Sequence, residues 1–292
     1  MASSPLAQSV EAPPAARRVS WPVIAWFGGL LLLCYAPILF RMVDQWATDE
    51  NMGHGFFVPL IAGYIAWKRK DLLLATPRQS SMWGLALVIW AGFQALAATL
   101  GAELFTARLA FVMALWGVVL FTGGKRWLKI LLFPLCLLLF MIPIPQILYA
   151  RLTLSLQMLA SELGELLIGA MGIPVIRTGN LLELPSQTLD IADACSGIRS
   201  LLSLGFLSLV YAYFTDKRPW MRWVLLIATV PIAIAANAIR VAVTGLLSEM
   251  DTKLAQGAYH EMEGYIVFIV ALVALLITHR VVSLAAKKFS KA

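Results

Sequence analysis

Apolar stretches of about 20 residues, separated by short clusters of Lys and Arg, recur along this 292-residue chain. A helix needs about 20 apolar residues to cross the hydrocarbon of a bilayer, and basic residues gather in the cytoplasmic loops between such helices. Hydrophobic residues make up 60% of the chain and charged residues only 13%, so one water-soluble core cannot bury them. The pattern predicts an all-α integral membrane protein.

The apolar runs predict about eight transmembrane helices, of which the second is short for a span. Arg151 to Gly172 carries two glutamates among leucines at helical spacing, which predicts an amphipathic or re-entrant helix. From Pro174 to Ala192 apolar residues alternate on both sides of a Pro-Ser turn, which predicts a small periplasmic β-hairpin outside the hydrocarbon. The predicted spans are Trp21 to Arg41, Gly55 to Trp67, Met82 to Leu100, Leu104 to Thr122, Trp127 to Leu148, Gly197 to Phe214, Trp220 to Leu247 and Gly264 to Val282.

The distribution of charge predicts the orientation of these helices. With a cytoplasmic N-terminus and an even number of crossings, every large basic cluster falls on the inner side and the acids fall mainly on the outer side. Membrane anchoring accounts for the net charge of +7, so membrane lipids are expected partners and nucleic acid is not. We expect a disordered cytoplasmic tail over 1–20, a transmembrane domain over 21–285 and a basic cytoplasmic tail over 286–292.

Cys195 stands where the predicted hairpin ends and a predicted span begins. Ser196 is a candidate N-cap of that helix. The positive end of the helix dipole and Arg199, one turn further on, would both favour the thiolate. A cysteine in a membrane protein is often a buried and inert side chain. The position of Cys195 among polar residues at the boundary favours a nucleophile instead.

Arg240 lies about 20 residues into a predicted span, and at about 1.5 Å per residue this places it at the outer edge of the bilayer. Asn237 is three positions earlier and shares its helix face. One interpretation is an arginine that anchors the helix by reaching the interface. The other is a functional group that faces protein, as ionisable residues at membrane depth usually do.

Two histidines are predicted on the same outer face as Cys195. His260 directly precedes the last span, and His54 follows the first one and competes for the role of base. Either is also compatible with an ordinary loop histidine. A thiolate, a histidine that moves protons and a cation that stabilises an oxyanion are the groups that acyl transfer from an amide requires. His, Cys and carboxylate residues lack metal-ligand spacing, so we expect no metal and no cofactor.

At these residues the sequence resembles the exosortase/archaeosortase family. The resemblance lies in the segments Ala194-Cys-Ser-Gly-Ile-Arg-Ser200 and Asn237-Ala-Ile-Arg240, in His260 before the final helix, and in the His54-Gly55 loop that precedes Trp67-Lys-Arg69. It covers about residues 20 to 285. Histidine as the third of these motif residues, after Cys195 and Arg240, resembles an exosortase. The lack of a long C-terminal extension resembles a short, single-module subclass such as exosortase B.

The resemblance implies a cysteine protease or transpeptidase of the bacterial inner membrane with a periplasmic active site. Its partners would be exported proteins with a C-terminal Pro-Glu-Pro-like motif, a transmembrane helix and a basic tail, as in PEP-CTERM proteins. Cys195 would be the nucleophile, Arg240 the thiolate or oxyanion partner, and His260 the proton shuttle. His54, Ser196, Arg199 and Asn237 would support them. Whether the resulting thioester passes to water or to an amine stays open.

Two other interpretations compete with the enzyme. A transporter or exopolysaccharide-export component would use Arg240, His54 and His260 to bind an anionic substrate. Transporters keep polar groups along a path through the bilayer, whereas here the middles of the spans are nearly free of charge and the polar residues gather at one edge. A purely structural subunit is the third interpretation.

Overall fold

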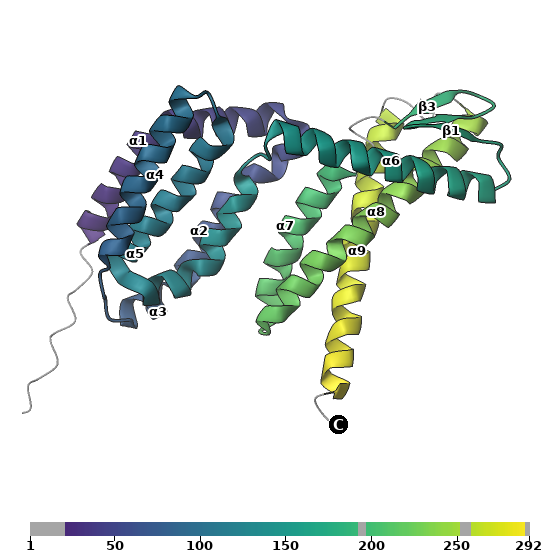
Figure 1. Cartoon of the computed structure of the whole chain (residues 1–292). Helices are drawn as coiled ribbons and strands as arrows, with labels where there is room; N and C mark the ends of the chain where they lie inside the picture. The colour runs from purple at the N-terminus through teal and green to yellow at the C-terminus, as the bar shows by residue number, and fades with distance from the viewer. Residues whose placement is uncertain (1–20, 192–196, 252–257, 290–292) are drawn as a thin grey trace, which may run out of the picture. The chain divides into compact units, whose positions relative to one another are not determined.

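The computed structural model describes residues 21–191, 197–251 and 258–289. Helices dominate this part of the chain (Figure 1). They are α1 (Trp21–Thr48), the 3₁₀ helix η1 (Glu50–Phe56), α2 (Phe57–Lys68), α3 (Lys70–Ala75), α4 (Met82–Leu100), α5 (Leu104–Leu137), the 3₁₀ helix η2 (Leu138–Met141), α6 (Gln146–Ala170), α7 (Ile198–Thr215), α8 (Pro219–Met250) and α9 (Ala258–Phe289). The strands are β1 (Ile176–Thr178), β2 (Leu181–Glu183) and β3 (Thr188–Asp190).

The chain forms two compact units. The first unit contains the chain up to Met42 together with Phe57–Leu139, and the second contains Val43–Phe56 together with the chain from Phe140 onward. The boundary therefore falls inside α1, and the second unit receives η1 from the N-terminal part of the sequence. Every site residue predicted from the sequence belongs to the second unit.

Close packing of α4 on α5 organises the first unit. A Cβ atom at Gly84 of α4 would lie 2.6 Å from the carbonyl oxygen of Gly117 on α5, so only glycine permits this approach of the two backbones. Small residues at helix contacts are typical of membrane proteins, where close van der Waals packing holds helices together. Gly124 has φ 78° and ψ −170° and breaks α5 into two helical segments.

Six helices of the described chain are long and apolar enough to cross a membrane, and these confirm the all-α membrane fold. The predicted number of about eight spans is not confirmed. The predicted span from Gly55 to Trp67 corresponds to α2, which has only 12 residues. The two predicted spans from Leu104 to Leu148 correspond to the two segments of α5 on either side of Gly124 and to η2, which form one continuous candidate span.

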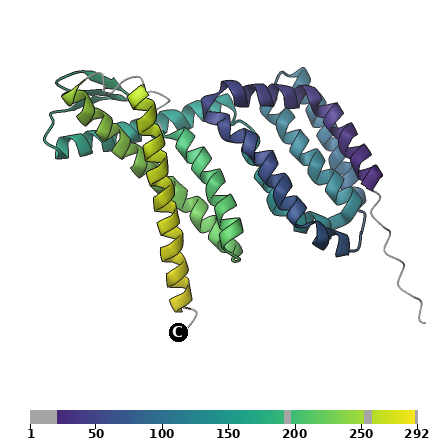
Figure 2. The same cartoon turned by 180° about the vertical axis from the view of Figure 1, so that it is seen from behind.

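In the second unit α7, α8 and α9 lie side by side, and α6 runs across one end of them (Figures 1 and 2). This end, marked by Ile198, Met250 and Ala258, is called the rim end below. The opposite end, at Thr215, Pro219 and Phe289, is called the basic end. As predicted, α6 is not among the candidate spans.

The predicted hairpin is present and carries one additional strand. β2 pairs antiparallel with both β1 and β3, and β2 and β3 flank the Pro-Ser turn. Leu182 of β2 is fully buried and packs with Ile168 of α6 and Val241 of α8. Glu249 of α8 accepts a hydrogen bond of 3.0 Å from the backbone N–H of Ser186 in the turn. These contacts hold the small sheet against the rim ends of α6 and α8.

Candidate active site

The first residue that the structure describes after the predicted nucleophile is Gly197, because Cys195 and Ser196 lie outside the described residues. Gly197 caps the N-terminus of α7 in the left-handed conformation, with φ 80° and ψ 0°. A Cβ atom here would lie 3.0 Å from Cγ of Asn237 on α8. Both the conformation and the contact favour glycine, and together they fix the start of α7 against α8.

Asn237 is 5% exposed and belongs to the middle of a junction between three helices. A small cavity beside it is lined by Ala160 of α6, Gly197 and Leu201 of α7, and Ala233 of α8, among others. A buried amide side chain has four hydrogen-bonding positions and is costly to bury unless these have partners. Asn237 therefore marks a polar point in an otherwise apolar contact. It lies against Gly197, which follows Cys195 by two positions in the sequence.

Arg240 lies one turn further along α8 and contacts α9. A Cβ atom at Gly264 would lie 3.4 Å from Nη2 and 3.5 Å from Cζ of Arg240, so the guanidinium packs on the backbone of α9. Gly264 is one helical turn after His260. The backbone of His260 forms the first turn of α9, while its side chain lies outside the described residues. One face of α8 thus brings together the segment that follows Cys195 and the segment that follows His260.

A buried carboxyl group at this position was not predicted from the sequence. Glu263 is 9% exposed, and Oε2 accepts a hydrogen bond of 2.7 Å from Oγ1 of Thr244 on α8. Thr244 Oγ1 is also 3.0 Å from the carbonyl oxygen of Arg240. The available signal was the spacing, since Glu263 follows His260 by three residues and Thr244 follows Arg240 by four, which places each pair on one helix face.

Arg199 joins α7 to η1. Its Nη2 is 2.6 Å from Oε2 of Glu50, and its Nε donates to Oδ1 of Asn51 at 3.3 Å. The side chains of Arg199 and Glu50 are 42% and 78% exposed, so this ion pair adds little to stability. Its positive charge, predicted to favour the thiolate, is therefore shared with the carboxylate of Glu50.

His54 is held in η1 by contacts within the second unit. Its Nε2 is 3.2 Å from the carbonyl oxygen of Phe140, and its ring centroid lies 6.2 Å from that of Phe206 on α7. Burial lowers the pKa of His54, while hydrogen bonds with the backbone of Phe140 and Asn51 oppose the shift. The neutral imidazole is thus favoured. The adjacent Gly55 packs under Trp46, whose indole N–H donates to the carbonyl oxygen of Met141 at 2.9 Å.

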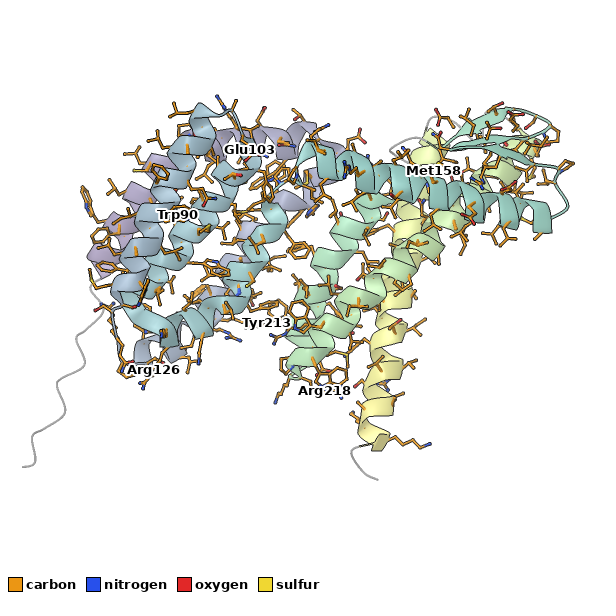
Figure 3. The ribbon with its side chains drawn as sticks, viewed as in Figure 1. Trp90, Glu103, Arg126, Met158, Tyr213 and Arg218 are labelled. Atoms are coloured by element: carbon orange, nitrogen blue, oxygen red, sulfur yellow. The ribbon has the colours of Figure 1, made fainter. Side chains whose placement is uncertain are left out.

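The basic end holds a second polar network. Asp216 bonds Nη2 of Arg218 at 2.6 Å and Nε2 of His279 at 3.3 Å, and the hydroxyl of Tyr211 lies 3.0 Å from Nδ1 of His279. The hydrogen bonds from Arg218 hold the pKa of Asp216 well below its usual range. Arg218, labelled in Figure 3, also donates to Ser283 of α9 at 2.9 Å. His279 and His260 lie toward opposite ends of α9.

The described residues contain no group of three or more His, Cys, Asp and Glu side chains arranged to hold a metal ion. In comparisons with known proteins, residues 46–277 match the family model described as transmembrane exosortase (Exosortase_EpsH). This range includes Cys195, Arg240, His260 and His54. No curated protein and no solved structure matches the chain significantly.

Proposed function

Since this chain belongs to the transmembrane exosortase family, we propose that it is a cysteine protease or transpeptidase that acts at the rim end of α7, α8 and α9. Its substrates are exported proteins that carry a C-terminal sorting signal with a Pro-Glu-Pro-like motif, a transmembrane helix and a basic tail. It acts in the inner membrane of a bacterium, with both termini in the cytoplasm and the rim end in the periplasm. A cytoplasmic basic end agrees with the positive-inside rule.

One observation carries this proposal. Along a single face of α8, Asn237 contacts Gly197 and Arg240 contacts Gly264. These glycines are the close sequence neighbours of Cys195 and His260, which are 65 positions apart. A nucleophile, a cation and an imidazole must lie within reach of one peptide bond for acyl transfer, and this packing supports their convergence.

The reaction begins when the thiolate of Cys195 attacks the carbonyl carbon of the scissile peptide bond. The carbonyl oxygen gains negative charge, and the guanidinium of Arg240 stabilises it. As the tetrahedral intermediate collapses, the C–N bond breaks, and His260 gives a proton to the departing amine. The thioester on Cys195 is then resolved by water or by an amine, which loses a proton to His260, and the thiolate leaves.

The small sheet supports the substrate side of this proposal. β3 is an edge strand, and it ends at Asp190, five residues before Cys195. An extended peptide that pairs with such an edge uses its backbone hydrogen bonds for affinity. We propose that the stretch of the substrate around its Pro-Glu-Pro-like motif pairs with β3 and so enters beside the nucleophile.

The test is the release of a membrane-anchored reporter that carries the sorting signal. Cys195→Ala is expected to abolish release and Cys195→Ser to reduce it strongly, because a serine hydroxyl is far less ionised than a thiol. Cys34→Ala is the matched control, since Cys34 is exposed on α1 in the first unit. Release by Cys195→Ala at the wild-type rate would contradict the proposal.

A further inference from the structure

Glu263 is a carboxyl group in apolar surroundings. It lines a groove between α8 and α9 whose other eight lining side chains are apolar, including Ile239, Val243 and Ile266. It is 9% exposed and belongs to a candidate membrane span. Burying a charge in such surroundings is costly, and ionisable groups in spans usually mark function. Stability therefore does not explain why a glutamate is buried at position 263, whereas a role in function does.

The hydroxyl of Thr244 ties Glu263 to the turn of α8 that carries Arg240. Thr244 Oγ1 lies 2.7 Å from Glu263 Oε2 and 3.0 Å from the carbonyl oxygen of Arg240. A hydroxyl group has one proton to donate and two lone pairs. It donates to Glu263 when the carboxyl is ionised, and it donates to Arg240 while accepting from Glu263 when the carboxyl is protonated. Thr244 thus suits both charge states of Glu263.

Glu263 directly precedes the residue of α9 on which the guanidinium packs. Arg240 packs on Gly264, the next residue of α9, with Nη2 3.4 Å from the place where a Cβ atom would stand. On the same helix, His260 precedes Glu263 by three positions, the spacing at which two side chains share a face. A negative charge here acts on both proposed catalytic groups, because charges interact strongly where water is scarce.

We propose that Glu263 is a positioning residue of the active site. Through Thr244 it fixes the start of α9 on α8, and through its charge it sets the place and the effective charge of Arg240. This inference rests on the proposed function, since it assigns Arg240 and His260 to the reaction.

The experiment compares Glu263→Gln with Glu162→Gln in the reporter assay. Gln keeps the size and the hydrogen-bond acceptor of Glu but not the charge, and Glu162 is an exposed glutamate on α6. We expect Glu263→Gln to lower kcat about tenfold with KM within about twofold, as for an interaction made mainly in the transition state. The alkaline limb of its pH profile moves to lower pH, because the imidazolium that gives its proton to the leaving amine is less stable without the negative charge.

A second pair of variants separates this role from folding. Thr244→Val removes the hydroxyl and is expected to lower kcat as Glu263→Gln does, whereas Thr244→Ser keeps the hydroxyl and retains most activity. If Glu263→Gln does not accumulate in the membrane, the kcat values of Thr244→Val and Thr244→Ser test the positioning role instead. A merely structural role would lower the amount of folded protein and leave the pH profile of the remainder unchanged.

Failure of the positioning role and failure of the proposed function would give different results. If Cys195→Ala is inactive but Glu263→Gln has the kcat and the alkaline limb of Glu162→Gln, only the positioning role is overturned. If Cys195→Ala still releases the reporter, the proposed function itself fails.

Discussion

The two ends of α7, α8 and α9 use the same kinds of side chain in different ways. At the basic end, Arg218, Asp216, His279 and Tyr211 form one chain of hydrogen bonds and ion pairs. At the rim end, Arg240 rests on the backbone of Gly264, and the carboxyl of Glu263 is held by the hydroxyl of Thr244. Both ends have an arginine, a carboxyl group and a hydroxyl group, so residue type alone does not distinguish a structural network from a site of chemistry.

The difference lies in what each guanidinium contacts. Arg218 has its charge matched by a carboxylate that is 7% exposed, and this locks the turn between α7 and α8 to α9. Among its contacts, Arg240 packs on the backbone of Gly264, where glycine leaves more space than any other residue would. A substrate carbonyl needs such a place beside a guanidinium. The comparison predicts that variants at the rim end change the reaction and that variants at the basic end change stability.

The largest expected effect comes from exchanging each arginine for glutamine. Arg240→Gln is expected to lower the rate of reporter release by roughly 10²–10³-fold with a normal amount of folded protein, because a group that stabilises the transition state is lost. Arg218→Gln is expected to lower the amount of folded protein and to keep the rate per folded molecule within about twofold of wild type. Rates normalised to folded protein provide the measurement. Equal losses of rate in both variants would remove the distinction between the two ends.

A smaller effect concerns pH and the basic end. The pKa of Asp216 is lower in the folded protein than in the unfolded chain, so its stabilisation is present above the unfolded value of about 4 and is lost as pH falls through the folded value. Asp216→Asn is expected to lower the unfolding temperature at pH 7 by roughly 5 °C. Its unfolding temperature should also fall less steeply than that of wild type below about pH 4. Thermal unfolding in detergent at several pH values measures both, and parallel curves would contradict the assignment.

The sequence predicted the helical membrane fold but not the number of candidate spans in the described residues, and the convergence of reactive groups at the rim end stays a prediction. The spacing of Asn237 and Arg240 and the glycine after Cys195 are local patterns, and the packing of α8 on both flanking segments agrees with them. The spans predicted as Leu104 to Thr122 and Trp127 to Leu148 divide on either side of Gly124, whose positive φ breaks α5. β1 has the sequence Ile-Arg-Thr, so only one of its residues is apolar and no apolar alternation marks it.

The contacts of Arg199 and Glu263 show why the rest of the site was not predicted. Arg199 pairs with Glu50, which is 149 positions earlier, and a single sequence carries no signal for such a distant pair. The charge pattern puts Glu263 among the acids of the outer side, because it stands close to His260 at the start of the last span. Its burial arises from the packing of α9 on α8, which a hydropathy pattern does not specify.

The smallest expected effect is at the exposed ion pair of the rim end. Glu50→Gln is expected to change the free energy of unfolding by about 1 kcal/mol or less, since both side chains are in contact with solvent. The substitution removes the carboxylate that pairs with Arg199, so the positive charge of Arg199 acts more strongly on the thiol of Cys195. Alkylation of this thiol is therefore expected to accelerate by about threefold at low salt. Labelling rates with a charged and a neutral thiol reagent measure the change. No change at low salt would exclude an electrostatic influence of Arg199 on the thiol.

The boundary between the two compact units has a consequence for the design of fragments of this protein. Only Val43–Phe56 of the N-terminal half belongs to the second unit, yet this short excursion supplies Glu50, Asn51 and His54. A fragment that begins at Phe140 would therefore omit a piece of its own scaffold, although it contains every residue proposed to react. Gene truncations, split reporters and domain grafts should keep that early insertion with the later helices, since the two compact bodies are interleaved along the polypeptide and do not follow one another in sequence.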